Sequence, residues 1–476
     1  MIEKSLHSRY NPRGEAERYI ASLNLGDDLR YIILIEPGLG YCIPPLKKRC
    51  PLAKIIALHL SGAAYIPGAE AHARWNSGSD GPLQEFLEKE IPETGGKTIK
   101  LVEWRPALGF YGEKYLKIVA ECAEFIKRIA AGDRTVKQFG RRWFRNFFRN
   151  IALIQKSPIF DPIEGPLLIA GAGPSLEDAI PLIRENREKL FVLAVSSATA
   201  ALAAAGIVPD LIISTDGGNW ALLHLYECGR CGDTRGKKPP LAAGLSAALP
   251  SQCSDIPLLF ISDGSLWQSI ILKGLGIPFI SLPQRGTVSA AALDLAMAIS
   301  RGKIFFTGID LSHRDIRTHA RPYAFDRLWE QEASRLNPVY HHHFERSAAI
   351  NAGGSQAIYA AWFRQQIAGW PRRIFSLGGN NQVFKGLEAA DGLIEYSAAK
   401  KTHMKDIALN FPKDPKNAAV EILRRALEAP RAPDSGETRL REELIPLLCP
   451  DNKEISAAAL IDWGLYSGAY PGVHNG

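Results

Sequence analysis

Short, uninterrupted apolar runs recur along this chain, and they limit its possible folds more than any other feature of the sequence. Residues within a run are mostly apolar and do not alternate with polar ones, as in parallel strands that helices cover on both faces. The runs are Tyr31–Ile35, Ile55–Leu60, Pro166–Ala170, Leu190–Val195, Leu211–Ser214, Pro257–Ile261, Pro278–Ser281 and Lys303–Thr307. Helical patterns such as Leu176–Lys189 and Val288–Ser300 separate several of them. The sequence therefore predicts an α/β fold with mostly parallel, Rossmann-like sheets.

The length of 476 residues corresponds to about three domains. We expect an N-terminal α/β domain over residues 1–105 and a helical linker over 106–160. The main α/β domain, expected to bind a nucleotide, then covers 161–385. Residues 386–476 are rich in Lys, Glu, Ala and Leu with Pro interruptions, which predicts a helical C-terminal region.

Composition and charge exclude several classes of protein. Hydrophobic residues make up 46% of the chain, which is too many for a disordered protein. The net charge of +7 permits anionic ligands but is too low for a dedicated nucleic-acid binder. Phe191–Pro209 carries no charge, but Ser196, Ser197 and Thr199 make it a poor membrane span, and the N-terminus lacks an apolar signal segment. We expect no stable membrane insertion and no nucleic-acid partner.

The seven cysteines are few, scattered and odd in number, which favours a reducing compartment such as the cytoplasm. Cys228 and Cys231 form one CxxC pair, and only Cys253 and His224 lie near enough in sequence to complete a zinc site. We favour two free thiols over zinc and expect no metal site here.

One segment, Val136–Ile151, mixes arginines with aromatic residues. On a helix, its aromatic residues share one arc and Arg141, Arg142, Arg145 and Arg149 share the opposite arc. Three interpretations are open: a packed helix with a solvated basic face, a membrane-surface helix, or a docking surface for an anionic partner.

The sharpest local signal is a strand, a glycine turn and a helix in the sequence LLIAGAGPSLED, residues 167–178. Gly171 and Gly173 lack a Cβ atom, so a ligand can approach the backbone closely. Ser175 and Asp178 have the spacing of a capping box, and the N-terminus of the helix would suit a phosphate. The third glycine of a dinucleotide fingerprint is replaced by Leu176, so a nucleotide site and a simple tight turn both remain open.

Small or polar residues also follow other predicted strands. The Ser, Thr, Gly and Asp residues are Ser196, Ser197, Asp216, Thr287, Ser289, Gly308 and Asp310, and Arg285 precedes Thr287. At the carboxyl ends of parallel strands such side chains suit sugar and phosphate recognition, and Asp216 or Asp310 would suit a ribose or a metal ion. His319 follows in a loop, where it is either a general acid or base or a surface histidine. His341, His342 and His343 form a run that is better explained by a polar loop than by a metal site.

These segments together resemble a known family. The GAGPSLE turn, the strand PDLIISTD and the segment GTVSAAALDLAMAISRGKIFFTGIDLS, within residues 160–385, resemble the MptE-like domain, named after archaeal 6-hydroxymethylpterin diphosphokinase. That domain also forms the core of the motility-associated factor (Maf) glycosyltransferases, which modify flagellin. Tyr31–Leu46 and the stretch from Thr135 to Asn150 resemble the longer Maf-like members.

The core is also similar to bacterial sialyltransferases that use CMP-sialic acid. Their GNGPSL, TSG and GID segments correspond to residues 171–176, 287–289 and 308–310, with Ala172 in place of their asparagine and Ser312 in place of a tyrosine. The similarity implies that Gly171, Gly173, Pro174 and Ser175 line the nucleotide. It also implies that Ser196 and Ser197 lie beside the base or ribose of the nucleotide. Thr287 and Ser289 would contact the nucleotide from the opposite wall of the site.

The resemblance implies a glycosyltransferase that moves a nonulosonic acid from a CMP-linked donor to Ser or Thr of flagellin. His319 would be its general base, Asp310 a second catalytic residue, and Arg285 or Arg321 would offset charge on the phosphate. This reading requires no cofactor. Two alternatives remain: a diphosphokinase that transfers pyrophosphate from ATP to a pterin alcohol with Mg²⁺ on Asp216 and Asp310, and a non-catalytic nucleotide-sugar-binding protein.

Overall fold

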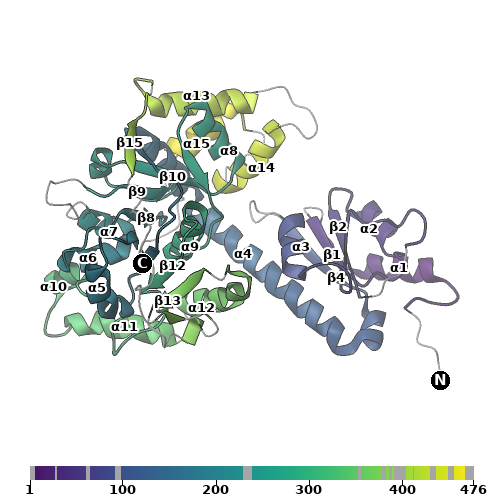
Figure 1. Ribbon diagram of the computed structural model, residues 1–476. Coiled ribbons are helices and arrows are strands. Elements are labelled where there is room, and N and C mark those ends of the chain that lie inside the picture. The colour runs from purple at the N-terminus through teal and green to yellow at the C-terminus, as the bar shows by residue number, and fades with distance from the viewer. Residues whose placement is uncertain are drawn as a thin grey trace. The chain divides into compact units, whose positions relative to one another are not determined.

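The computed structural model divides the chain into two units (Figure 1). Unit 1 contains residues 1–141 and 441–455, and unit 2 contains residues 142–440 and 456–476. The structure describes residues 6–26, 29–60, 65–91, 98–228, 238–351, 355–371, 373–377, 382–384, 387, 389–390, 404–410, 412–428, 436–448 and 455–466.

Unit 1 is built on a four-stranded parallel sheet with the order β3-β2-β1-β4. Its strands are β1 (Leu29–Ile35), β2 (Lys54–His59), β3 (Ala73–Asn76) and β4 (Thr98–Glu103). The helices α1 (Pro12–Ser22), α2 (Ile43–Arg49) and α3 (Leu83–Glu90) accompany this sheet. The two central strands are almost wholly buried, which explains why β1 and β2 are the most continuous apolar runs of this unit.

Unit 2 contains a nine-stranded sheet with the order β11-β10-β9-β8-β7-β6-β12-β13-β14, and every neighbouring pair is parallel. The strands are β6 (Leu167–Ala170), β7 (Phe191–Val195), β8 (Leu211–Ser214), β9 (Leu241–Gly244), β10 (Leu258–Ser262), β11 (Phe279–Ser281), β12 (Ile304–Thr307), β13 (Ile374–Leu377) and β14 (Ala389–Ala390). A separate antiparallel pair joins β5 (Lys156–Ile159) to β15 (Lys405–Ala408).

Helices connect these strands, with α5 to α7 on one side of the sheet and α9 on the other (Figure 1). The helices of unit 2 are α5 (Ser175–Glu185), α6 (Thr199–Ala204), α7 (Ala221–Cys228), α8 (Leu266–Gly274), α9 (Val288–Ile299), α10 (Asp326–Glu332), α11 (Val339–Asn351), α12 (Ser355–Gln366), α13 (Pro415–Glu428) and α15 (Ala457–Tyr466). The long α4 (Leu108–Leu153) and α14 (Gly436–Leu448) each have residues in both units.

The prediction of an α/β fold with mostly parallel sheets is confirmed. Each of the eight apolar runs overlaps a strand, while β3, β4, β5, β9, β13, β14 and β15 lie outside those runs. Residues 106–160, expected as a helical linker, contain α4 and the strand β5, and the boundary between the two units falls within α4. The helices α13 to α15 lie within residues 386–476. The described part of the chain has no helix that is long and apolar enough to cross a membrane.

The aromatic stripe on α4 is packed inside unit 2. Phe144, Phe147 and Phe148 are fully buried, and Phe147 contacts the Trp267 ring of α8 with the ring centroids 4.6 Å apart. Of the three interpretations of this segment, the packed helix agrees with this burial. A membrane-surface helix does not, because its aromatic residues would have to face outward.

The same helix holds two strand-end loops in place through asparagine side chains that the sequence pattern did not suggest. The Asn146 amide donates to the carbonyls of Gly217 (3.3 Å) and Ser246 (3.0 Å). The Asn150 amide donates to those of Leu245 and Ala247, both at 2.9 Å. Both asparagines are buried, so these bonds satisfy carbonyls in the loops after β8 and β9.

We predict that Asn150→Ala lowers the free energy of unfolding by about 2 kcal/mol or more, because two backbone carbonyls lose their buried donor. The exposed Arg149 next to it is the matched control, and Arg149→Ala should change stability by less than about 0.5 kcal/mol. Thermal and urea unfolding of both variants measure this difference. Equal stabilities would contradict the role assigned to the amide.

Candidate functional site

The order of strands in unit 2 identifies one place in the sheet where a ligand would bind. From β6, strands β7 to β11 extend the sheet in one direction, and β12 to β14 extend it in the other. The chain therefore leaves β6 and β12, which are neighbours, towards opposite sides. Open α/β sheets bind ligands at the carboxyl ends of strands at such a switch point. The GAGPS loop follows β6 and the GID segment follows β12, so both lie at this point.

These two loops lie directly against each other. The Gly171 amide donates to the Thr307 carbonyl (2.8 Å), and the Gly173 amide donates to the Gly308 carbonyl (2.7 Å). A Cβ atom at Gly171 would overlap the Gly308 carbonyl, and one at Gly173 would overlap the Asp310 carboxylate. The sequence suggested that these glycines leave room for a ligand. In the structure the neighbouring loop occupies that room.

Ser175 and Asp310 complete this contact. The Ser175 amide donates to Oδ2 of Asp310 (3.0 Å), and the Gly308 amide donates to Oγ of Ser175 (2.9 Å). The capping-box prediction for Ser175 is wrong, because α5 begins at Ser175, its N-cap is Pro174, and the Ser175 hydroxyl is used by Gly308. Burial raises the pKa of Asp310 above its ordinary value, while the hydrogen bonds from Ser175 and the charge of Arg314 act in the opposite direction.

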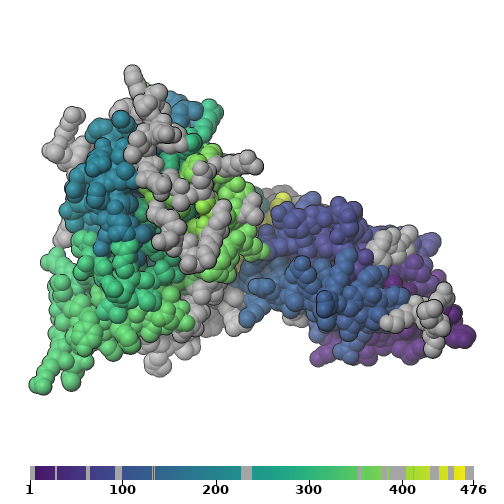
Figure 2. Space-filling model, turned by 60° about the horizontal axis from the view of Figure 1, so that its bottom comes forward, coloured from purple at the N-terminus to yellow at the C-terminus, as the bar shows by residue number. Residues whose placement is uncertain are grey.

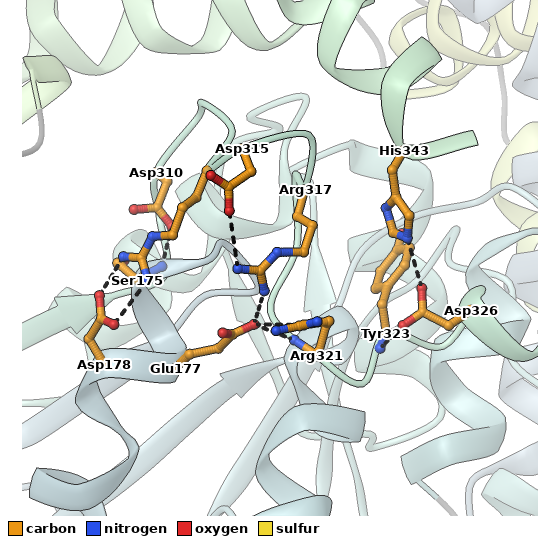
Figure 3. Close-up of polar contacts among 11 residues, drawn as sticks. Ser175, Glu177, Asp178, Asp310, Asp315, Arg317, Arg321, Tyr323, Asp326 and His343 are labelled. Carbon is orange, nitrogen blue, oxygen red and sulfur yellow. Dashed lines mark hydrogen bonds and ion pairs between the residues drawn. The ribbon is translucent and has the colours of Figure 1, made fainter. Parts of the chain in front are cut away.

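The segment after Asp310 is fastened to the first turn of α5 by ion pairs (Figure 3). Glu177 accepts from the Arg317 guanidinium (2.8 Å) and from the Arg321 backbone amide (2.9 Å). Asp178 forms a two-bond pair with Arg314 and has a lowered pKa, chiefly because of the hydrogen bonds from that guanidinium. The two acidic residues that would oppose an anion at α5 are thereby paired with arginines of residues 313–321.

His319 lies in this fastened segment and is half-buried. Its ring stacks on Tyr323 with centroids 4.0 Å apart, and Nδ1 lies 2.8 Å from Oγ1 of Thr318. Burial, followed by the positive charge of Arg346, lowers the pKa of His319 to about 3. The imidazole is therefore neutral at pH 7.

An aromatic cluster continues from His319. Tyr323 stacks on Phe325, whose ring lies near Trp329, and the Arg346 guanidinium lies 5.4–5.9 Å from the centroids of these three rings. His224 of α7 contacts Tyr323 and Phe325 as well, and burial lowers its pKa to about 4. In the space-filling view the green surface around residues 310–350 adjoins the teal surface of the α5–α7 region (Figure 2).

The three consecutive histidines lie on α11, where the sequence suggested a loop. His341 is exposed and pairs with Glu345 (3.2 Å), His342 stacks on Trp329, and His343 faces Asp326 (3.7 Å). They do not converge on one point, and no cluster of metal-ligating side chains occurs among the described residues. Cys231 and the side chain of Cys228 lie outside the described residues, so the suggested CxxC pair has no structural account.

The other predicted site residues occupy the same carboxyl edge of the sheet. Ser196 is buried after β7, and Ser197 beside it is half-buried. Asp216 after β8 is exposed, and its Oδ1 accepts from the Gly218 amide (2.8 Å). Thr287 is the N-cap residue of α9 but makes no side-chain capping bond, and Ser289 is half-buried in the first turn.

Arg285 has partners within the protein. Its guanidinium pairs with Asp294 (2.6 Å) and lies over the Trp362 ring (5.2 Å). Tyr359 of α12, which sequence reasoning missed, contacts the Gly286 position, and burial and the charge of Asp216 raise its pKa.

The structure brings Gly171, Gly173, Ser175, Gly308 and Asp310 into direct contact. Sequence reasoning missed Arg314 and Arg317. Both lie in the segment HRDIR shortly after a predicted strand, and they pair with the adjacent residues Asp178 and Glu177. Tyr359 and Arg346 gave no comparable signal, because Asp216 and Tyr323, with which they interact, are distant in the sequence.

A family model matches the central part of the chain. Residues 142–315 match the model described as 6-hydroxymethylpterin diphosphokinase MptE-like. They include β6 to β12 and the candidate residues up to Asp310, while His319 and Arg321 follow the matched range.

Two relatives are proteins of Treponema pallidum (strain Nichols) that bear the description "Uncharacterized protein". One is 29% identical over 287 residues, which is 59% of this chain and 60% of the relative. The other is 29% identical over 217 residues, which is 43% of this chain and 37% of the relative. The matches thus span less than two thirds of the length of these relatives.

Among solved structures, a Maf glycosyltransferase from Magnetospirillum magneticum AMB-1 has a TM-score of 0.46 and 14% sequence identity. The match covers 96% of this chain and 81% of that chain.

We predict that Arg317→Ala lowers the free energy of unfolding by about 1.5–3 kcal/mol, because the largely buried Glu177 carboxylate loses a charged donor. Arg301→Ala is the control, since Arg301 and Glu164 form an exposed pair worth about 1 kcal/mol or less. Urea unfolding of both variants checks the prediction. Equal losses would show that residues 313–321 are not held through Arg317.

Proposed function

We propose that this chain, whose residues 142–315 match the MptE-like family model, is a glycosyltransferase that moves a sugar from a nucleotide-activated donor to a protein hydroxyl. The observation that carries the proposal is the meeting of the β6 and β12 loops at the switch point, with Asp310 between them and His319 nine residues later. Small hydroxyl, glycine and carboxylate residues at the neighbouring strand ends support recognition of a polyhydroxylated ligand.

In detail, we propose a CMP-linked nonulosonic acid as donor and Ser or Thr of flagellin as acceptor. The acceptor oxygen forms a bond to the anomeric carbon of the sugar. The bond between that carbon and the CMP phosphate oxygen breaks, and its electron pair leaves with CMP. The acceptor proton passes to a base on the enzyme. This reaction is balanced without a cofactor, and we place it in the cytoplasm, in agreement with the sparse, scattered cysteines.

His319 is our candidate for that base. In the tautomer in which Nδ1 donates to Thr318, Nε2 carries the lone pair that would accept the proton. A pKa of about 3 is low for a general base. The negative phosphate of a bound donor would raise the pKa of His319 and bring the imidazole closer to the range in which proton transfer is efficient.

Arginine side chains supply positive charge for the departing phosphate. Arg321 is the more available of the two sequence candidates, because its side chain is 62% exposed and its guanidinium lies 3.8 Å from Glu177. Arg285 is held by Asp294, so its charge is largely balanced before a ligand binds.

The description of the matching family favours a second candidate, transfer of pyrophosphate from ATP to a pterin alcohol. That reaction uses Mg²⁺, which carboxylates such as Asp216 and Asp310 would hold. The Asp310 carboxylate accepts a hydrogen bond from the Ser175 amide, and the Asp216 carboxylate accepts one from the Gly218 amide. Both carboxylates would therefore have to bind the metal while keeping or losing these hydrogen bonds.

Calorimetry of the full chain with CMP, CTP and ATP, each with and without Mg²⁺, separates the candidates. We predict that CMP binds with the same affinity with and without Mg²⁺, since no metal takes part in the proposed recognition. If ATP is the only one of the three nucleotides that binds, and if its binding requires Mg²⁺, the result would support the pyrophosphate transfer instead. Absence of binding by all three nucleotides would leave the proposal without support and favour a non-catalytic role.

We predict that His319→Ala lowers kcat for sugar transfer by about 10²–10⁴-fold, the usual contribution of a positioned base. Unchanged CMP affinity shows that the variant is folded, and added imidazole should restore part of the rate. A variant that transfers sugar at the wild-type rate would exclude His319 as the base.

A further inference from the structure

The first turn of α5 already holds a carboxylate. Asp310 projects from the loop after β12, and its Oδ2 accepts the hydrogen bond of the Ser175 amide at the start of the helix (Figure 3). A Cβ atom at Gly173 would overlap that same oxygen, so the glycine makes room for the carboxylate. The position at which a phosphate would meet the helix is therefore filled by the protein itself.

The backbone donors around this carboxylate are also engaged. The amides of Gly171 and Gly173 donate to carbonyls of the β12 loop, and those of Leu176 and Glu177 donate to Gly173 and Pro174. A phosphate at a helix N-terminus depends on free amides of this kind. Here it would also meet the negative charge of Asp310, whereas Glu177 and Asp178 are paired with arginines.

The Asp310 carboxylate still has acceptor sites for another partner. Within the described residues, its hydrogen bonds come from Ser175, through the backbone amide to Oδ2 and through the side chain. A carboxylate has about four lone-pair sites, and this side chain is only partly buried. A carboxylate held in this way accepts a hydrogen bond from a hydroxyl group and repels an anion.

We propose that Asp310 selects a hydroxyl group of the ligand at α5 and excludes its phosphate. Building on the proposed function, the ribose of the nucleotide is the part that meets Asp310, and the phosphate lies away from the first turn of α5. Two like charges about 4 Å apart repel each other enough to weaken phosphate binding by between about fivefold and several hundredfold, depending on the local dielectric.

The test uses inorganic phosphate and cytidine as separate probes of the full chain. Wild type should bind phosphate at α5 weakly, and Asp310→Ala should bind it at least tenfold more tightly, because the Ser175 amide becomes free. Cytidine should bind Asp310→Ala at least tenfold more weakly than it binds wild type. The affinity of 2′,3′-dideoxycytidine, which lacks the ribose hydroxyls, should differ much less between wild type and the variant. Chemical shifts of the Ser175 amide identify the site.

Asp178→Ala is the matched control. It removes another carboxylate from the same turn, one that is paired with Arg314 and does not touch the Ser175 amide. It should change both affinities by less than about threefold. If Asp310→Ala does not fold, Asp310→Asn, which has the same shape without the charge, should still gain phosphate affinity.

Equal phosphate affinity in wild type and both Asp310 variants would overturn the proposal, as would equal binding of cytidine and dideoxycytidine to wild type. Failure of the proposed function is a separate result. If no nucleoside binds, glycosyl transfer from a nucleotide donor is excluded, and the phosphate measurements still decide whether Asp310 excludes anions.

Discussion

The contact between the loops after β6 and β12 is the constraint on which the rest of the site depends. Its hydrogen bonds join Gly171 to Thr307, Gly173 to Gly308 and Ser175 to Asp310, across two strands that are neighbours in space and more than 130 residues apart in sequence. Side chains larger than hydrogen at Gly171 and Gly173 would separate these loops. Because this contact fixes Asp310, it also fixes where the following segment begins, and the ion pairs of Glu177 and Asp178 hold that segment with His319 against α5.

Much of the architecture follows from patterns that are local in the sequence. Fully buried parallel strands need apolar residues on both faces, so β6, β7 and β12 could be read from continuous runs alone. β9 has the same length as β6, but its sequence LAAG is too rich in small residues to give that signal. The placement of the polar strand ends on one edge also follows, since parallel strands all end on the same edge.

The chemistry of the site was harder to predict, because it depends on contacts between distant residues. A glycine turn before a helix is compatible with a phosphate or with another part of the protein, and only the fold shows that Asp310 takes that place. Likewise, the arginines of α4 suggested a basic surface, while Asn146 and Asn150, which hold the strand-end loops, stood out by neither hydropathy nor charge. The low pKa of His319 arises from burial among Tyr323, His224 and Arg346, which come from three different segments.

A crystal structure of the full chain with bound CMP tests the central claim most directly. The account predicts a ribose hydroxyl within about 3 Å of the Asp310 carboxylate, with the bond from the Ser175 amide to Asp310 intact. It also predicts a phosphate that makes no contact with the first turn of α5. A phosphate bound to the Ser175 amide, with Asp310 displaced from it, would contradict the account.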